Sequence, residues 1–341
     1  MEKAEKLLEI KNLVDCLINS VWGLLEMNFY NKPYVLVIGA SVVDIFGFSC
    51  CDYKAYNSNP GKIKISFGGV CRNIAENLSK VGVNTKLISI LGEDDNGKCM
   101  LEHSRKIGYD MEDSLILKNA TTPTYMAILD EKGEMVSGVA DMKSIDKMDS
   151  KFIDSKATII EKSEYTVLDS DNAKILEYIL KKFKGKTKFI LDPVSAEKAK
   201  NIKHLIKYFH TIKPNIHEAE VLSGFKIKSI EDLKKAAEYF ISLGIENVFI
   251  SLDAEGIYYK NKFEEGKIKA NKVKVKNVTG AGDAFVAGIA YGYMNKLSLK
   301  ETVKFAITMA NLTIAHENTI NPDLNYNIVE NNMKNIEWIE E

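Results

Sequence analysis

Residues 277–283 read Asn-Val-Thr-Gly-Ala-Gly-Asp, a run of small residues that ends in one carboxylate, Asp283. The run follows a strand-like alternation (Val273, Val275) and precedes an apolar helical pattern at residues 284–290. At such a junction backbone N–H groups can point at an anion, and the helix dipole adds positive potential there. Asp283 therefore has two interpretations: a cap of the helix N-terminus, or a carboxylate that does chemistry beside a bound anion.

A second segment places two glycines, Gly68 and Gly69, before another helical pattern at residues 72–81. Paired glycines let the backbone approach a ligand closely and give freedom for a hinge. Asn73 lies in the first turn of the expected helix and could hydrogen-bond hydroxyl groups. The same glycine pair is also typical of a plain turn, so this segment alone leaves both interpretations open.

The whole chain has the composition of an ordinary soluble protein. It has 341 residues, 45% of them hydrophobic and 27% charged, which is enough for one large or two smaller domains. A formal net charge of −1 gives no electrostatic basis for a nucleic-acid or membrane surface. The longest apolar stretch, residues 34–48, is interrupted by Asp44 and is too short to span a bilayer, and no leader opens the chain. We therefore expect a cytoplasmic protein without nucleic-acid or membrane partners.

The cysteines and histidines give no sign of a metal site. The cysteines form an odd set without metal-ligand spacing, which is typical of a reduced cytosolic protein. They are Cys16, Cys50, Cys51, Cys71 and Cys99. His217-Glu218 lacks the second histidine of a zinc-protease helix. A catalytic metal-hydrolase site is therefore not expected.

From residue 34 onward, expected strands alternate with expected helices. Residues 34–38 are a continuous apolar run, as in a buried parallel strand. Further strands are expected at residues 86–90, 165–168, 188–191, 211–212 and 247–251, and helices at residues 72–81, 172–183, 195–208 and 230–243. This alternation predicts an α/β fold built from βαβ units around a mostly parallel sheet.

Two stretches, residues 46–67 and 121–142, contain strand-like runs without a long helix between them. We expect them to pair as a small antiparallel sheet, a lid over the C-terminal ends of the parallel strands, where open α/β sheets bind ligands. Residues 33–330 then form one catalytic domain with a lid. Residues 1–32 are expected to form a separate helical extension that packs on this domain, joins an oligomer or remains from a helix-turn-helix. Its single clear helix and mixed charge argue against DNA binding.

Together the two glycine-containing segments resemble a known family. Gly68-Gly69-x-x-x-Asn73-x-Ala75, followed much later by Thr279-Gly280-Ala281-Gly282-Asp283, is similar to the ribokinase-like (PfkB) carbohydrate and nucleoside kinases. The resemblance covers about residues 34–330. It implies a three-layer α/β/α body with a mostly parallel central sheet and a β-sheet lid. It also implies transfer of the γ-phosphoryl group of ATP to a hydroxyl of a small-molecule sugar or nucleoside.

The resemblance implies a role for each matched residue. Asp283 is expected to be the catalytic base, and the N–H groups of Gly280, Ala281 and Gly282 to form an anion hole for the transferring phosphoryl group. The motif that begins at Asn215, the Asn-x-x-Glu of the family, would bind ATP and hold Mg²⁺. The glutamate of that motif, Glu218, acts on Mg²⁺ through water.

Other matched positions imply contacts with ATP and a cation. Ser251 and Gly256 belong to a segment that resembles the nucleotide-binding turn of the family, although Asp253 stands where glycine is usual. Asn311 is similar in position to residues that line the adenine pocket. Asn277 and Thr279 are candidate ligands for potassium, with Asn277 standing where relatives often have aspartate.

The most specific likeness is to the pseudouridine kinase branch of the family. Residues 68–82 resemble its first motif, and similar segments recur at residues 139–142, 192–199, 213–220 and 319–322. The implied reaction is 5′-phosphorylation of pseudouridine. The implied substrate contacts are Asp44, Gly68, Gly69 and Asn73 on the ribose and Arg72 and Asp141 on the base.

Two alternatives for the function stay open from the sequence. Val42 stands where the family usually has asparagine, which leaves ribose or another ribonucleoside as the runner-up acceptor. A non-catalytic, ligand-sensing protein on the same fold is the alternative of another class. Assembly as a homodimer through the lid is the expected quaternary structure.

Overall fold

The computed structural model describes residues 32–271 and 273–341. The chain divides into two compact units, Met1–Pro33 and Tyr34–Glu341. The predicted helical extension at residues 1–32 lies, except for Lys32, outside the described residues. The predicted end of the catalytic domain at residue 330 stays a prediction.

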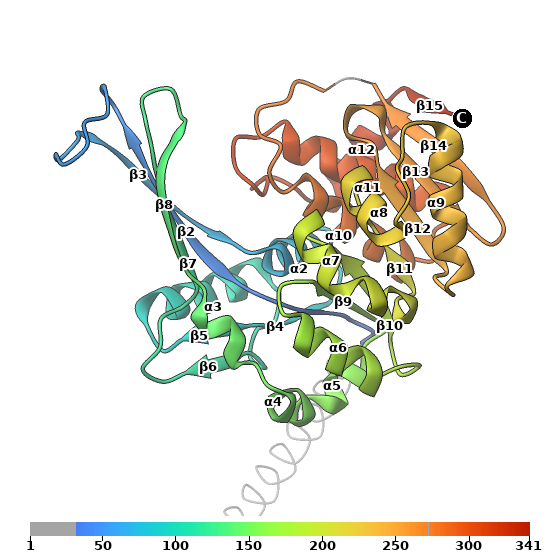
Figure 1. Cartoon of the computed structure of the whole chain (residues 1–341), viewed down its shortest axis with the longest axis horizontal. Coiled ribbons are helices and arrows are strands. Elements are labelled where there is room, and N and C mark those ends of the chain that lie inside the picture. Colours follow the sequence, from blue (N-terminus) through green and yellow to red (C-terminus); the bar gives the residue numbers. More distant parts are fainter. Residues whose placement is uncertain (1–31, 272) are drawn as a thin grey trace, which may run out of the picture. The chain divides into compact units, whose positions relative to one another are not determined.

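In the described residues a nine-stranded sheet forms the centre of the second unit, with the strand order β15-β14-β13-β12-β11-β10-β9-β1-β4 (Figure 1). The strands from β4 to β12 pair in parallel, and the three at the other edge pair antiparallel. Their bounds are β1 (Val35–Ile38), β4 (Thr85–Ile88), β9 (Tyr165–Asp169), β10 (Lys188–Asp192), β11 (Thr211–Ile212), β12 (Asn247–Ser251), β13 (Ile257–Asn261), β14 (Glu265–Ala270) and β15 (Trp338–Glu340). The predicted mostly parallel sheet is confirmed.

Helices cover both faces of this sheet, because alternate residues of its apolar strands point to opposite sides. In β1, Val35 and Val37 pack into one hydrophobic cluster, and Leu36 and Ile38 pack into another. The first cluster includes α2 (Val70–Lys80), α3 (Asp95–Ile107), α10 (Ala281–Met294), α11 (Leu299–Ile314) and α12 (Tyr326–Asn335). The second includes α4 (Ser150–Ser155), α5 (Ala157–Lys162), α6 (Ala173–Lys182), α7 (Ala196–Ile202), α8 (Ile216–Ser223) and α9 (Ile230–Ser242). The predicted three-layer α/β/α arrangement is confirmed.

A separate four-stranded sheet forms the lid, in the order β3-β2-β7-β8. Its strands are β2 (Val42–Ser49), β3 (Gly61–Gly68), β7 (Thr124–Leu129) and β8 (Met135–Asp141). The prediction of an antiparallel lid is wrong in one respect, since β2 and β7 run parallel. These two strands are joined by a long connection through α2 and α3 rather than by a hairpin, and parallel pairing requires such a crossover.

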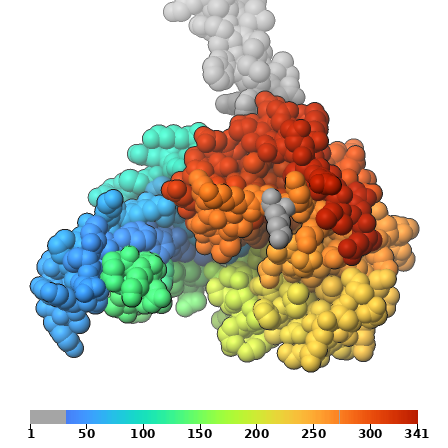
Figure 2. All heavy atoms as spheres, turned by 90° about the horizontal axis from the view of Figure 1, so that it is seen from above, coloured from blue at the N-terminus to red at the C-terminus, as the bar shows by residue number. Residues whose placement is uncertain are grey.

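The lid projects from one side of the main body, the part of the second unit outside these four strands (Figure 1). Figure 2 shows a hollow between the lid, in blue and green, and the yellow and orange part of the main body. Because β3 ends at Gly68 and α2 begins at Val70, the first turn of α2 lies at the base of the lid.

Short elements complete the unit. A two-stranded parallel sheet joins β5 (Ile90–Gly92) and β6 (Leu115–Leu117). Three turns of 3₁₀ helix are η1 (Lys143–Lys147), η2 (Lys203–Tyr208) and η3 (Asp253–Glu255) in the described residues. The helix predicted at residues 195–208 is thus divided between α7 and η2. Within residues 32–271 and 273–341, no helix is long and apolar enough to cross a membrane.

Candidate active site

The first turn of α10 has the backbone geometry of an anion-binding helix start. Gly280 is the N-cap residue, with φ +84°, and a Cβ at this position would overlap the carbonyl oxygen of Thr319. Only glycine fits both the left-handed conformation and the close approach. The N–H of Ala284 donates to the carbonyl of Gly280, whereas the earlier N–H groups of a helix have no intrahelical acceptor. These groups are therefore available to an anion.

Asp283 lies in this same turn but does not cap the helix. The N-cap residue, Gly280, makes no side-chain capping bond. The Asp283 carboxylate is buried, with 8% of the residue exposed, and its Oδ2 accepts a 2.7 Å hydrogen bond from Nδ2 of Asn73. The capping interpretation of Asp283 is wrong, because the side chain points across to α2 rather than back to its own helix.

The surroundings of Asp283 suit it to accept a proton. Burial is the main cause that raises the pKa of its carboxyl, from 3.8 to about 7, and the nearby Asp192 carboxylate adds to the rise. The hydrogen bond from Asn73 and the charges of Lys213 and Arg72 act in the opposite direction. A general base works best when its pKa lies close to the working pH.

The glycine pair before α2 is sterically required rather than a plain turn. Gly68 ends β3, and a Cβ there would overlap Oδ2 of Asp44. Gly69 is the N-cap residue of α2 with φ +95°, and a Cβ there would overlap the carbonyl oxygen of Ala40. The two glycines therefore let the turn before α2 pack closely against the strand that carries Asp44.

Asp44 is placed to receive hydrogen bonds from a ligand. It lies within β2, half-buried, and has no hydrogen-bond or ion-pair partner among the described residues. Burial raises the pKa of its carboxyl from 3.8 to about 6, while the charge of Arg72 lowers it. A carboxylate that is desolvated without a protein partner is costly unless a ligand supplies donors. The position predicted to contact ribose thus has unused acceptor capacity.

Arg72 makes its contacts with the protein. Its guanidinium donates to Glu76 at 2.7 Å, to the carbonyl of Phe67 at 2.7 Å and to Oδ1 of Asn73 at 2.5 Å. Glu76 also contacts His103 at 2.9 Å. The side chain of Arg72 is only 3% exposed. Arg72 therefore orients Asn73, and through it Asp283, whereas its predicted contact with the base stays a prediction.

Asp141 is not brought to the same face as Asp44. In the lid register Asp44 lies opposite Tyr125, and Tyr125 lies opposite Ala140. Because side chains alternate along a strand, the next residue, Asp141, belongs to the other face of the sheet. Its carboxylate accepts a 2.8 Å hydrogen bond from Thr121. The predicted base contact of Asp141 stays a prediction without support from this geometry.

On the other side of the hollow, the Asn-x-x-Glu motif forms a capping box. Asn215 is the N-cap residue of α8; its Oδ1 accepts from the N–H of Glu218, and Glu218 Oε2 accepts from the N–H of Asn215, both at 2.9 Å. Glu218 is 4% exposed, and burial raises the pKa of its carboxyl. The capping box fixes one carboxylate oxygen and leaves the other available, as a water-mediated contact with a cation requires.

The predicted nucleotide-binding positions adjoin this motif. Ser251 pairs with Asn215 in an isolated β-bridge. Asp253 adopts φ +49°, a left-handed conformation that glycine favours and aspartate tolerates, so the departure from the family pattern preserves the turn. Gly256 has φ +90°, and a Cβ there would overlap the carbonyl oxygen of Ile268.

Asn311, on α11, carries a buried side-chain nitrogen without a hydrogen-bond partner among the described residues. Buried polar groups are normally hydrogen-bonded, so this amide is suited to a ligand.

Asn277, a predicted potassium ligand, instead orders its own loop. Its Oδ1 accepts from the N–H of Thr279 at 2.9 Å and its Nδ2 donates to the carbonyl of Glu317 at 3.1 Å. The predicted potassium ligands, Asn277 and Thr279, are thus adjacent to the anion hole and to each other.

Two features of the site were not assigned from the sequence. Lys213 and Asp192 form a buried ion pair of 3.4 Å next to Gly282. Asp192 is the last residue of β10 and Lys213 follows β11 directly, and a charged residue at the carboxyl end of a parallel strand is the signal that identifies them. In the lid, Phe46 and Tyr125 form an edge-to-face pair with ring centroids 6.1 Å apart. The alternation of side chains along a strand would have placed Phe46 on the face of Asp44, whereas the position of Tyr125 depends on the pairing of β2 with β7.

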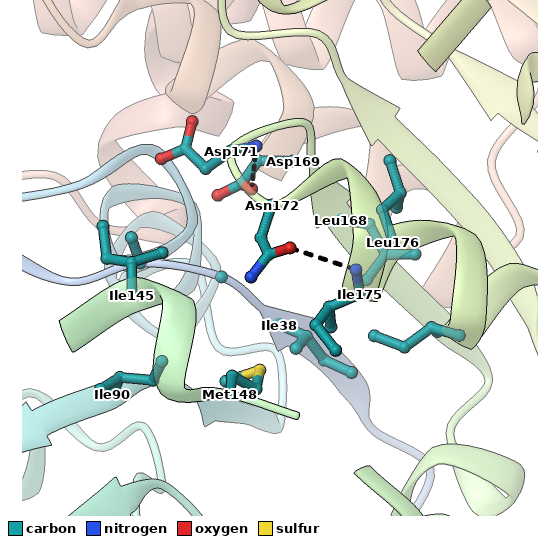
Figure 3. Close-up of a pocket in the computed structure, with 13 residues that line it drawn as sticks. Ile38, Ile90, Ile145, Met148, Leu168, Asp169, Asp171, Asn172, Ile175 and Leu176 are labelled. Carbon is teal, nitrogen blue, oxygen red and sulfur yellow. Dashed lines mark hydrogen bonds between the residues drawn. The ribbon is translucent and has the colours of Figure 1, made fainter. Parts of the chain in front are cut away.

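A cavity lies beside the end of β1 (Figure 3). Its walls are mainly apolar side chains of β1, η1 and α6, and Asp169, Asp171 and Asn172 lie on one side of it. Its volume is about 40 Å³, which is room for only a few water molecules. This cavity is therefore too small for a nucleoside or ATP, and the hollow between lid and main body is the candidate binding site.

Comparison with known proteins agrees with this geometry. Residues 32–325 match the model of the pfkB family carbohydrate kinases. The chain belongs to the pfkB family. Its members are ATP-dependent phosphotransferases, so the predicted family and the predicted type of reaction are confirmed.

Relatives within the pfkB family act on different acceptors. The chain is 34% identical to the pseudouridine kinase of Escherichia coli (strain K12), over 90% of this chain and 99% of the relative. It is 29% identical to a ribokinase of Staphylococcus aureus (strain COL), over 82% and 93%. A crystal structure from Clostridium perfringens described as a sugar kinase is 63% identical, covers 91% of this chain and 98% of that chain, and superposes with a TM-score of 0.88.

The residues of the site fit ATP with Mg²⁺, the usual phosphoryl donor of this family. The free oxygen of Glu218 and the unpartnered amide of Asn311 are suitable contacts for them. Within the described residues no group of three or more His, Cys, Asp or Glu side chains could hold a metal ion. A bound Mg²⁺ would therefore take most of its ligands from phosphate and water, as is common for this ion.

Proposed function

We propose that this protein is an ATP-dependent kinase that phosphorylates the 5′-hydroxyl of a ribonucleoside, with pseudouridine as the substrate. One observation carries the proposal. A buried base, Asp283, is held by Asn73, and Asn73 belongs to the same short segment as Gly68, which packs against the unpartnered carboxylate of Asp44. The segment of residues 68–73 thus connects Asp44, which would bind sugar hydroxyls, with Asp283, which would remove the hydroxyl proton.

The chemistry follows from these placements. The acceptor oxygen forms a bond to the γ-phosphorus of ATP, the bond from that phosphorus to ADP breaks, and the hydroxyl proton passes to Asp283. The N–H groups at the start of α10 stabilise the negative charge on the transferring group. Mg²⁺, when bound, neutralises charge on the triphosphate. Asp44 accepts hydrogen bonds from two sugar hydroxyls and orients the acceptor.

The lid supports a nucleoside rather than a free sugar. Phe46 lies two residues after Asp44 and Tyr125 lies opposite Asp44, so strand alternation puts all three on one face. Aromatic rings on the face that carries the sugar-binding carboxylate can stack on a planar base. Two relatives are named for nucleoside acceptors, the pseudouridine kinase and a guanosine-inosine kinase of Exiguobacterium acetylicum that is 24% identical.

Ribose and other ribonucleosides are the second candidates. Val42, which replaces a polar residue common in the family, is buried with 8% exposed and gives no hydrogen bond to an acceptor.

A non-catalytic sensor is disfavoured because a buried carboxylate whose pKa is raised to about 7 by burial has a use in catalysis and a cost in stability.

The test is a measurement of ADP release by purified protein with ATP, Mg²⁺ and K⁺ and a panel of sugars and nucleosides that includes pseudouridine. We expect saturable activity with pseudouridine, and the product to be pseudouridine 5′-phosphate. Saturable activity with ribose or another nucleoside and none with pseudouridine would contradict the acceptor. No ADP release with any acceptor would favour the sensor.

We also propose that potassium stimulates the reaction, through Thr279 and backbone carbonyls near Asn277. The loop beside the anion hole supports this, because Asn277 ties the segment before α10 to the carbonyl of Glu317. Replacing K⁺ by a bulky organic cation in the same assay should lower kcat. Equal rates in both media would contradict this proposal.

The outer face of the lid supports a homodimer. The face opposite Asp44 carries exposed apolar side chains from β3, β7 and β8: Ile63, Ile65, Met126, Ile128 and Val139. An apolar patch of this kind marks an interaction surface, and in a two-fold dimer the same patch of both copies forms the interface. Sedimentation velocity should show a dimer that Ile65→Glu dissociates. A monomeric wild-type protein would contradict the proposal.

A further inference from the structure

Lys213 lies next to the first turn of α10. It follows β11, and its side chain is 8% exposed. A Cβ placed on Gly282 would lie 2.9 Å from its Nζ. The ammonium group therefore lies close to the backbone of the predicted anion hole, although no role follows for it from the sequence.

The charges around Lys213 keep it protonated. Burial by itself lowers its pKa, but Asp192, Glu218 and Asp283 act in the opposite direction, and the net effect raises the pKa. One of these carboxylates, Asp192, is within ion-pair distance of the ammonium group. Lys213 cannot act as a proton acceptor, and its contribution must be its positive charge and its N–H donors.

The donors of Lys213 are not matched by protein acceptors. A lysine ammonium has three N–H groups, and among the described residues its one ion-pair partner is Asp192 Oδ2, at 3.4 Å. The other oxygen of Asp192 accepts from the N–H of Val194 at 2.8 Å. A buried ammonium with spare donors is costly unless a ligand accepts from them, and next to Gly282 the expected ligand is a phosphoryl oxygen.

We propose that Lys213 is a further catalytic residue, which donates hydrogen bonds to the transferring phosphoryl group together with the N–H groups of residues 280–282. The inference rests on the phosphotransferase function proposed above. As the new O–P bond forms and the bond to ADP breaks, the hydroxyl proton passes to Asp283 and Lys213 keeps its own protons. Its charge offsets the negative charge that the acceptor and the phosphoryl group bring beside Asp192 and Asp283.

The alternative is that Lys213 only neutralises Asp192 and has no contact with substrate. The two roles predict different results for Lys213→Met, which removes the charge and keeps the length of the side chain. A structural lysine would change the stability of the fold. A catalytic lysine would change the affinity for an analogue of the transferring group.

The experiment measures ADP binding by calorimetry with Mg²⁺, with and without aluminium fluoride, in the presence of the acceptor found in the ADP-release screen. Wild-type protein should bind ADP more tightly when aluminium fluoride occupies the phosphoryl position. In Lys213→Met the increase in ADP affinity caused by aluminium fluoride should be at least tenfold smaller than in the wild-type protein. The affinity for ADP alone should stay within about threefold of the wild-type value. Loss of one such donor should also lower kcat by roughly 10²-fold, and Lys213→Arg should recover part of both.

Lys156→Met is the matched control. Lys156 is also a largely buried lysine, 20% exposed, that pairs with an aspartate, Asp113, at 3.0 Å, but it lies between α4 and α5. It should keep the full tightening by aluminium fluoride. If Lys213→Met does not fold, the double variant Lys213→Met with Asp192→Asn removes both charges of the pair, and the same loss of tightening is expected.

Two results would overturn the inference in different ways. Full tightening in folded Lys213→Met, or in the double variant, would show that Lys213 does not contact the phosphoryl group and would leave the kinase function intact. A wild-type protein that neither releases ADP with any acceptor nor shows tightening would contradict the kinase function and the inference together.

Discussion

Asn73 donates a 2.7 Å hydrogen bond to Asp283, and these residues are 210 positions apart in the chain. The bond joins the first turn of α2 to the first turn of α10, so the proposed base is held by the segment that packs against Asp44, the proposed acceptor-binding carboxylate. Arg72, itself held by Glu76, fixes the other end of the Asn73 amide. The geometry of the base therefore depends on a buried polar network and not on α10 alone.

Asp283→Asn should abolish turnover and leave ATP binding measurable. The amide keeps the size of the side chain but cannot accept the hydroxyl proton, and a general base contributes roughly 10²- to 10⁴-fold. Steady-state kinetics and calorimetry with ATP check both parts. A kcat within a few-fold of wild type would show that another group is the base.

The same substitution should stabilise the fold above neutral pH. The folded-state pKa of Asp283 is raised above 3.8, to about 7, so its contribution to stability is present below pH 3.8 and is lost as the pH rises through 7. Asp283→Asn removes this loss and should raise the free energy of unfolding above pH 7 by at most roughly 4 kcal/mol, because a shift of one pKa unit corresponds to about 1.4 kcal/mol. Thermal unfolding should show a higher Tm for the variant at pH 8 and no advantage near pH 4. A variant that is less stable at pH 8 would contradict the assignment of a desolvated carboxylate.

The pH profile of kcat/KM should show two ionisations on its acid side. Asp283 must be deprotonated to accept a proton, so activity should fall as the pH drops below about 7. Asp44 must be ionised to accept two hydroxyl hydrogen bonds, so the fall should steepen below about 6. Asp44→Asn should remove the steeper part while it raises KM for the acceptor. A profile that is flat between pH 5 and 8 would rule out both assignments.

Gly280→Ala should lower kcat strongly, whereas Gly82→Ala should have little effect on activity. Both glycines have similar left-handed conformations, with φ +84° and +85°. A Cβ on Gly280 overlaps the carbonyl oxygen of Thr319, while a Cβ on Gly82 meets nothing within 4 Å. The Gly82 variant should therefore lose only about 1–2 kcal/mol of stability from backbone strain, which would be measured as a lower Tm. Equal losses of kcat in the two variants would show that the anion hole does not depend on this close approach.

Phe46→Ala should weaken the binding of a nucleoside and not that of free ribose. Loss of a stacking ring costs about 1–3 kcal/mol per base, which corresponds to roughly 5- to 150-fold in KM. Competition of each compound against the best acceptor measures the two affinities. Phe263→Ala is the control, since Phe263 is 92% exposed and lies outside the lid. Equal weakening of ribose and nucleoside would remove the argument for a stacked base.

Much of this architecture follows from local sequence patterns. The parallel strands and the helices α2, α6 and α9 lie within a few residues of their predicted positions, because burial on both faces of a parallel strand leaves a continuous apolar run such as residues 35–38. The helices α3, α4, α5 and α8 were not predicted. The parallel pairing of β2 with β7 was not predicted, since register and direction depend on where the intervening α2 and α3 return the chain. The antiparallel edge β13–β15 depends likewise on contacts between residues far apart.

The sequence by itself determined the two glycine-rich helix starts and the family, and it singled out the proposed base, because these depend on residue types at fixed local spacing. Tertiary structure decided what each charged group contacts. Arg72 donates a hydrogen bond to Asn73, Asp44 has no protein partner among the described residues, and the ammonium group of Lys213 lies close to Gly282. Burial and charge pairing are properties of the packed molecule, and they set the pKa of Asp283, so no reading of the chain alone could supply them.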